Sequence, residues 1–204
     1  MKITAIKVQI NDASRYSIFL DGRYAFSLSD LALLKNQLVL GQELSKDELK
    51  KLELVASDDK AYADTLKYLS IRPRSRWEIK TYLKRKGTSL DSAEEIMDRL
   101  AAQGLVDDKA FADSWLNNRR TTKLSSFKKL RAELQRKHID QSIIDQLLGD
   151  GQNTERRALA ELIKIKAKLP RYKNDKLKLM QYLSRQGFNY GDIKDALNES
   201  ESEI

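Results

Sequence analysis

The sequence predicts a mainly α-helical protein that consists of three tandem three-helix repeats after a small N-terminal β-hairpin/α extension. Three observations support this fold class. Of the 204 residues, 41% are hydrophobic and only two are proline, a composition that suits a packed helical core. The beginning of the chain alternates between apolar and polar residues. Later segments repeat at nearly constant intervals.

The alternating segment predicts the β-hairpin. Ile6, Val8 and Ile10 are separated by polar or charged residues, so they would share one face of a strand. Two further alternating segments flank the dipeptide Asp21-Gly22. This dipeptide favours a two-residue hairpin turn, because both turn positions need a positive φ.

Helical signals begin after the hairpin. Ser45 and Glu48 have the spacing of a capping box, in which each side chain satisfies a free backbone N–H at the start of a helix. Another helix is expected from about Asp59 to the residues before Pro73, because proline cannot continue a helix.

Two strings show that the helical part is a repeat. Ala61-Tyr-Ala-Asp64 recurs as Ala110-Phe-Ala-Asp113, and Leu83-Lys-Arg-Lys86 recurs as Leu134-Gln-Arg-Lys137 and more loosely as Leu183-Ser-Arg-Gln186. The intervals are 49, 51 and 49 residues. Such regularity marks one supersecondary unit used several times.

Each repeat is expected to contain three helices. The expected divisions are residues 1–57 for the hairpin and following helices, 58–107 for repeat 1, 108–153 for repeat 2, and 154–204 for repeat 3 with a short acidic tail. The residues expected to cap the helices of repeats 2 and 3 are Asp107, Ser125 or Ser126, Asp140, Asn153 or Thr154, Asn174 and Asn189.

The net charge of +8 favours an anionic partner. Seven basic residues lie in 72–86 and eight in 119–137, each group with a single acidic residue. The candidate binding residues are Arg72, Arg74, Arg76, Lys80, Lys84, Arg85, Lys86, Arg119, Arg120, Lys123, Lys128, Lys129, Arg131, Arg136, Lys137 and Arg185. Alternatively, any one of these clusters binds no partner and is simply a solvated helix face that keeps the protein soluble.

Three short helices also resemble a helix-turn-helix DNA reader, so a direct DNA-binding regulator is an alternative function. The third helix of repeat 1 argues against base reading, because its exposed positions include Asp91, Glu94, Glu95 and Asp98. The basic residues lie on the second helix instead, where they would touch phosphates or acidic protein without reading bases.

Four other residues have structural explanations. Asp107 is expected to cap a helix rather than bind a metal, and His138 to end one. Trp115 shares a helical face with Phe111 and is expected in the core. Trp77 either packs within its repeat or stacks on a nucleic-acid base.

The residue inventory disfavours an enzyme. The chain has no cysteine and one histidine, which disfavours thiol catalysis and zinc sites, and it lacks a glycine-rich phosphate loop. We expect no cofactor and no metal. No apolar stretch approaches the ~20 residues that span a bilayer, so we expect a cytoplasmic protein without membrane contact. An enzyme that uses scattered carboxylates is the third hypothesis considered.

Several strings together resemble the RecX family of recombination regulators. They are Tyr68–Ile79 (YLSIRPRSRWEI), Leu100–Asp108, Phe111-Ala112 with Trp115, and Leu183–Phe188. The hairpin is similar to an N-terminal extension of some members. The sequence departs from the family pattern at two positions. His138 stands where the other repeats have Gly87 and Gly187, and Gln186 replaces a basic residue.

The resemblance implies a non-enzymatic protein that binds the RecA recombinase. Family members are understood to lie in the groove of the RecA filament on single-stranded DNA. There they suppress strand exchange, ATP turnover and the coprotease role of RecA in the SOS response. The implied partners are the RecA filament and, weakly and without sequence preference, single-stranded DNA. The chain itself would be a monomer.

Overall fold

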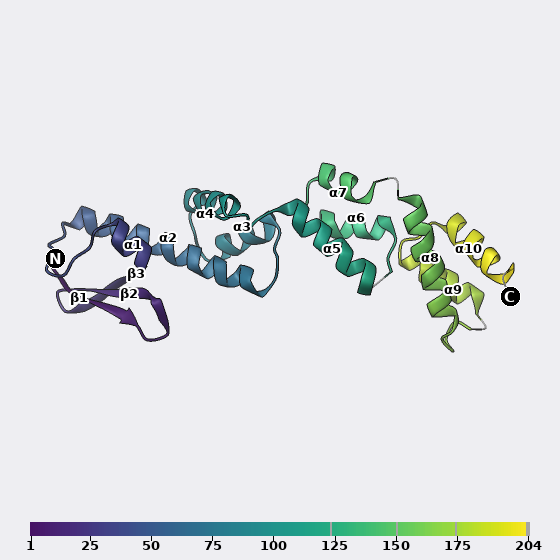
Figure 1. Ribbon diagram of the computed structural model, residues 1–204, viewed down its shortest axis with the longest axis horizontal. Helices are drawn as coiled ribbons and strands as arrows, with labels where there is room; N and C mark the ends of the chain where they lie inside the picture. Colours follow the sequence, from purple (N-terminus) through teal and green to yellow (C-terminus); the bar gives the residue numbers. More distant parts are fainter. Residues whose placement is uncertain (123, 150, 174, 203–204) are drawn as a thin grey trace. The chain divides into compact units, whose positions relative to one another are not determined.

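The structure, a computed structural model, describes residues 1–122, 124–149, 151–173 and 175–202, without the side chains of 120–122, 152–153 and 200–202 (Figure 1). It divides into two compact units, Met1–Val106 and Asp107–Ile204. The elements of unit 1 are β1 (Ile3–Gln9), β2 (Asp12–Leu20), β3 (Arg23–Ser29), α1 (Asp30–Lys35), α2 (Lys46–Ile71), α3 (Arg76–Arg85) and α4 (Leu90–Ala102). Those of unit 2 are α5 (Asp108–Thr122), α6 (Phe127–Gln135), α7 (Gln141–Leu148), α8 (Gln152–Ala167), α9 (Lys176–Arg185) and α10 (Tyr190–Ser202).

The N-terminal segment is an antiparallel sheet of order β1-β2-β3, in which β2 and β3 form the expected hairpin and β1 is the expected strand before it. The expected turn is confirmed: Asp21 and Gly22 have φ of 47° and 82°. Val8 and Ile10 do not form an apolar face toward the core, because they are 53% and 102% exposed. The core contact of β1 comes from Ile3 instead, which is 1% exposed.

Helix α2 joins the sheet to repeat 1. Its capping box is confirmed, because the side chains of Ser45 and Glu48 each accept a hydrogen bond from the other's backbone N–H. The helix expected from about Asp59 begins at Lys46 instead, because no proline or glycine interrupts residues 46–71. It ends before Pro73, and the expected boundary between residues 57 and 58 falls inside it.

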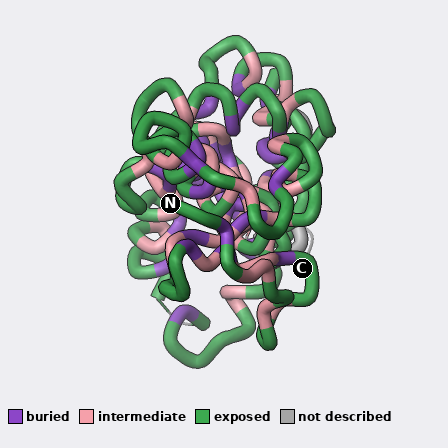
Figure 2. Tube along the Cα trace, turned by 90° about the vertical axis from the view of Figure 1, so that its left-hand side faces the viewer, coloured by how far each residue is buried: buried purple, intermediate pink, exposed green. Residues whose placement is uncertain are grey.

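Each group of helices has its own core. Leu52 and Ala56 of α2 pack against the sheet, and Tyr62 further along α2 packs against α3 and α4. In unit 2, separate apolar clusters join α5 with α6 and α7, and α8 with α9 and α10. Buried and exposed residues alternate along the helices, as expected of helices that turn one face to a core (Figure 2).

The expected caps in repeat 2 are confirmed. Asp107 accepts hydrogen bonds from the N–H groups of Lys109 and Ala110, and Ser126 and Asp140 cap α6 and α7. Of the two serines considered for α6, Ser126 is the cap.

In repeat 3 the caps differ in part. Helix α8 begins at Gln152 after Gly151, so Asn153 and Thr154 lie inside it. A side chain at Gly151 would meet the ring of Phe127 at 2.7 Å, which leaves no room for a capping residue there. Asn174 lies outside the described residues, and α9 is capped by Asp175. Asn189 accepts from the N–H of Gly191, as expected of a cap.

The second turn of every repeat needs a left-handed residue. Gly87, His138 and Gly187 have φ of 78°, 55° and 92°. His138 therefore ends its helix as expected. It does so in a backbone conformation that glycine adopts at lower cost.

Candidate partner-binding surface

The first basic cluster follows the end of α2. Arg72 donates to both carboxylate oxygens of Glu78, at 3.1 and 3.0 Å. These hydrogen bonds raise the pKa of the Arg72 guanidinium above its ordinary value. Glu78 is buried and also closes the capping box of α3 with Ser75. Arg72 is thus held inside the repeat.

Two other cations each form an ion pair with a carboxylate on the third helix of their own repeat. Lys80 lies 2.7 Å from Glu94, and Arg131 bonds to Asp145. The hydrogen bond from Arg131 lowers the pKa of Asp145. The two pairs occupy equivalent positions, because each partner in repeat 2 follows its counterpart by 51 residues. Exposed pairs of this kind stabilise a protein by at most about 1 kcal/mol.

Further cations contact residues of unit 2. The Nε of Arg119 donates to Glu133 at 2.8 Å, and the Nζ of Lys129 donates to Gln186 at 2.6 Å. Lys137 lies over the ring of Trp115. Lys123 lies outside the described residues, as does the side chain of Arg120.

The remaining candidates in the second helices are exposed. Lys84, Arg85, Lys128, Arg136 and Arg185 are exposed, and no described residue accepts a hydrogen bond from their side chains. Three of these arginines, Arg85, Arg136 and Arg185, occupy the same position in their repeats, at the C-terminal end of α3, α6 and α9. A cation there complements the helix dipole, and its charge stays available to an anionic partner.

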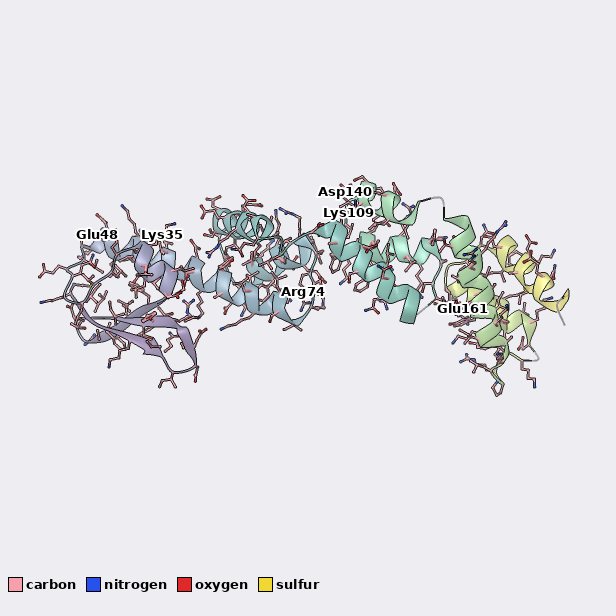
Figure 3. The ribbon with its side chains drawn as sticks, viewed as in Figure 1. Lys35, Glu48, Arg74, Lys109, Asp140 and Glu161 are labelled. Atoms are coloured by element: carbon pink, nitrogen blue, oxygen red, sulfur yellow. The ribbon has the colours of Figure 1, made fainter. Side chains whose placement is uncertain are left out.

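The other three candidates of repeat 1 lie at the ends of α3: Arg74 before its N-cap, Arg76 at its first position and Lys86 at its C-cap. Arg74, labelled in Figure 3, comes from the turn between α2 and α3. Its guanidinium lies 3.9 Å from the ring centre of Tyr68, and Lys86 lies 5.6 Å from that of Tyr82. Arg76 is half-buried at the first position of α3.

The two tryptophans have different environments. Trp115 is half-buried against the core of repeat 2, as expected, and its Nε1 donates to Glu133 at 3.2 Å. Trp77 is 41% exposed on α3. Sequence reasoning missed the tyrosines Tyr68 and Tyr82, whose stacking depends on how α2 and α3 meet.

Two features are absent from the part of the chain that the structure describes. No group of three or more His, Asp or Glu side chains could hold a metal ion. Among the same residues, no helix is long and apolar enough to cross a membrane.

The N-terminal sheet, the helical repeats and their exposed arginines define a tandem three-helix repeat protein with basic surfaces. Three family models match the chain. They describe the Regulatory protein RecX N-terminal domain (residues 1–45), the first three-helix domain of RecX (61–100) and the second three-helix domain of RecX (107–148).

Curated relatives agree over nearly the whole chain. "Regulatory protein RecX" of Bacillus licheniformis is 35% identical over 98% of this chain and 78% of its own length. The protein of the same name from Halalkalibacterium halodurans is 31% identical, over 99% and 77%. A crystal structure of regulatory protein RecX has a TM-score of 0.71 and 29% identity, covering 95% of this chain and 98% of its own. The chain belongs to the RecX family of regulatory proteins.

Proposed function

We propose that this protein binds the RecA filament on single-stranded DNA and lowers its recombinase, ATPase and coprotease activities. Membership of the RecX family supports RecA as the partner. The protein would act without catalysis or a cofactor, as a monomer in the cytoplasm.

The observation that carries the proposal is the repeated arginine. Arg85, Arg136 and Arg185 are exposed at the same position of three successive repeats. A partner that is itself a polymer offers the same acidic or phosphate group many times. Weak contacts from each repeat then combine through effective concentration.

The alternative, a sequence-specific helix-turn-helix regulator, has less support. Helix α4 is the third helix of repeat 1, and Asp91, Glu94, Glu95 and Asp98 are all exposed on it. These carboxylates would repel the phosphates that line a DNA groove. We therefore expect DNA binding by the protein alone to be weak, salt-dependent and tolerant of sequence.

Charge reversal tests the proposed surface. The variants are Lys84→Glu with Arg85→Glu, and Lys128→Glu with Arg136→Glu. None of the four side chains has an acceptor among the described residues, so each change should alter stability by no more than about 0.5 kcal/mol. Inhibition of RecA should fall strongly with each pair, and further when both are combined, because repulsion replaces attraction at two repeats.

The matched control is Glu95→Lys with Asp98→Lys on α4, which changes the same number of charges on exposed positions. Inhibition of RecA-catalysed ATP hydrolysis and circular dichroism should be measured for all variants. Full inhibition by both basic-pair variants, with loss only in the control, would place the binding surface on the opposite side of the repeats.

A further inference from the structure

In each repeat, an aromatic ring contacts the second helix, and the residue that it contacts there occupies the equivalent position in all three repeats. Tyr68 stacks on Tyr82 with 4.3 Å between ring centres and 4° between planes. Tyr172 lies 5.5 Å from Tyr182. In repeat 2 the equivalent of these two second-helix tyrosines is Glu133, according to the intervals of 51 and 49 residues.

Cations lie over these rings in all three repeats. The pairs are Arg74 and Lys86 in repeat 1, Arg119 and Lys137 in repeat 2, and Lys166 and Arg171 in repeat 3. A guanidinium stacked on a ring has a fixed orientation and keeps its hydrogen-bond donors at its edge. We call the rings and the two cations of each repeat a platform: two tyrosines in repeats 1 and 3, and Trp115 alone in repeat 2.

The platform of repeat 2 already holds an anion. One carboxylate oxygen of Glu133 accepts hydrogen bonds from the Nε of Arg119 at 2.8 Å and from the Nε1 of Trp115 at 3.2 Å. The side chain of Glu133 is only 17% exposed. The chain itself therefore shows which chemistry this arrangement takes: an oxyanion bound by a stacked cation.

The platform of repeat 1 lacks this internal anion, because Tyr82 replaces the glutamate. The Nε of Arg74 is buried and has no hydrogen-bond partner among the described residues. A buried donor without a partner is unusual in a folded protein and calls for an explanation. The stacking of the guanidinium on Tyr68 holds it in place without an acceptor.

We propose that the platform of Tyr68, Tyr82, Arg74 and Lys86 binds a phosphate of single-stranded DNA, and that Glu133 takes the place of this phosphate in repeat 2. A single strand suits the site because its phosphates match the guanidinium and its unpaired bases can stack beside the rings. This inference rests on the proposed function and assigns the DNA contact to particular repeats.

Two variants test the proposal in opposite directions. Glu133→Gln keeps an acceptor for Trp115 and Arg119 but removes the charge, so the second platform should become available to phosphate. Arg74→Gln with Lys86→Gln should inactivate the first. Each phosphate contact contributes about 0.7 to the slope of log affinity against log salt on single strands. Glu133→Gln should steepen the slope by about 0.7, and the double variant should flatten it by about the same amount, because each platform is proposed to bind one phosphate.

The measurement is fluorescence anisotropy of a labelled oligothymidylate with the full chain at several salt concentrations. Lys50→Gln with Lys60→Gln is the control, because both lysines are exposed on α2 and the charge change is the same. The control should leave the slope unchanged. An unchanged slope for Glu133→Gln, or a loss in the double variant no larger than in the control, would overturn the proposal.

Inhibition of RecA by the same variants separates this inference from the proposed function. Variants that bind the oligonucleotide like the unmodified protein but no longer inhibit RecA would show that the platform contacts protein, which contradicts the phosphate assignment. Unaltered oligonucleotide binding with full inhibition would also contradict it and would leave the RecA proposal standing.

Discussion

Replacing Gly187 by alanine is expected to destabilise unit 2 by about 2 to 5 kcal/mol, from two costs that add. Gly187 has a φ of 92°, and a left-handed conformation costs an L-residue about 1 to 2 kcal/mol. The new Cβ would also clash with the Oγ of Ser126. That hydroxyl is buried and donates to the carbonyl of Gln186 at 2.9 Å. Displacing it leaves a buried polar group unpaired, which costs about 1 to 3 kcal/mol.

The equivalent positions provide the controls. A Cβ at Gly87, where φ is 78°, would meet no atom within 4 Å, so Gly87→Ala should cost only the backbone part, about 1 to 2 kcal/mol. His138→Gly should stabilise its repeat, because glycine adopts the positive φ without strain. Urea unfolding with hydrogen exchange in α9 would measure the three effects. Equal losses for Gly187→Ala and Gly87→Ala would show that the contact with Ser126 is unimportant.

Asp59→Ala is expected to lower the free energy of unfolding of unit 1 by about 3 to 5 kcal/mol, the range for breaking a buried ion pair. Asp59 lies 3.0 Å from Arg15, and the two side chains are 11% and 8% exposed. Its carboxylate also accepts from the N–H and the hydroxyl of Ser29, at 2.8 and 2.5 Å. It therefore joins α2 to β2 and to the start of α1, and its removal leaves Arg15 buried without a counter-charge.

A second variant distinguishes the lost pair from general disruption. Arg15→Met with Asp59→Leu removes both charges and should recover most of the stability, because the uncompensated charge is gone. Lys67→Ala is the matched control: Lys67 also pairs with the sheet, at Asp12, but is 67% exposed. It should cost less than about 1 kcal/mol. Urea unfolding followed by circular dichroism measures all three, and a similar small cost for Asp59→Ala and Lys67→Ala would contradict the account.

Local signals predicted much of the fold, because they act within a few residues. The Asp21-Gly22 turn and the capping box that begins at Ser45 are where the sequence placed them. The continuity of α2 was missed, because a second helix start was expected near Asp59. That residue instead pairs with the buried Arg15, and such distant pairs leave no local pattern.

The sequence predicted the positive charge of the candidate surface, but not which of its cations form ion pairs within the protein. Counting cations identified the second helices, yet Arg72, Lys80 and Arg131 each contact an acidic side chain of their own repeat. Superposing the repeats would have shown that Lys80 and Arg131 share acidic partners at equivalent positions. The contacts of Lys129 with Gln186, and of Ser126 with the turn at Gly187, join two repeats and need the folded structure.

The proposed function of this chain is the regulation of RecA. The direct test is ATP hydrolysis by the cognate RecA on single-stranded DNA, with and without this protein at a substoichiometric ratio. We expect hydrolysis to fall well below the rate of RecA alone, because one bound chain would contact several filament subunits. An unchanged rate, even when the protein is added in equimolar amount, would contradict the proposed function.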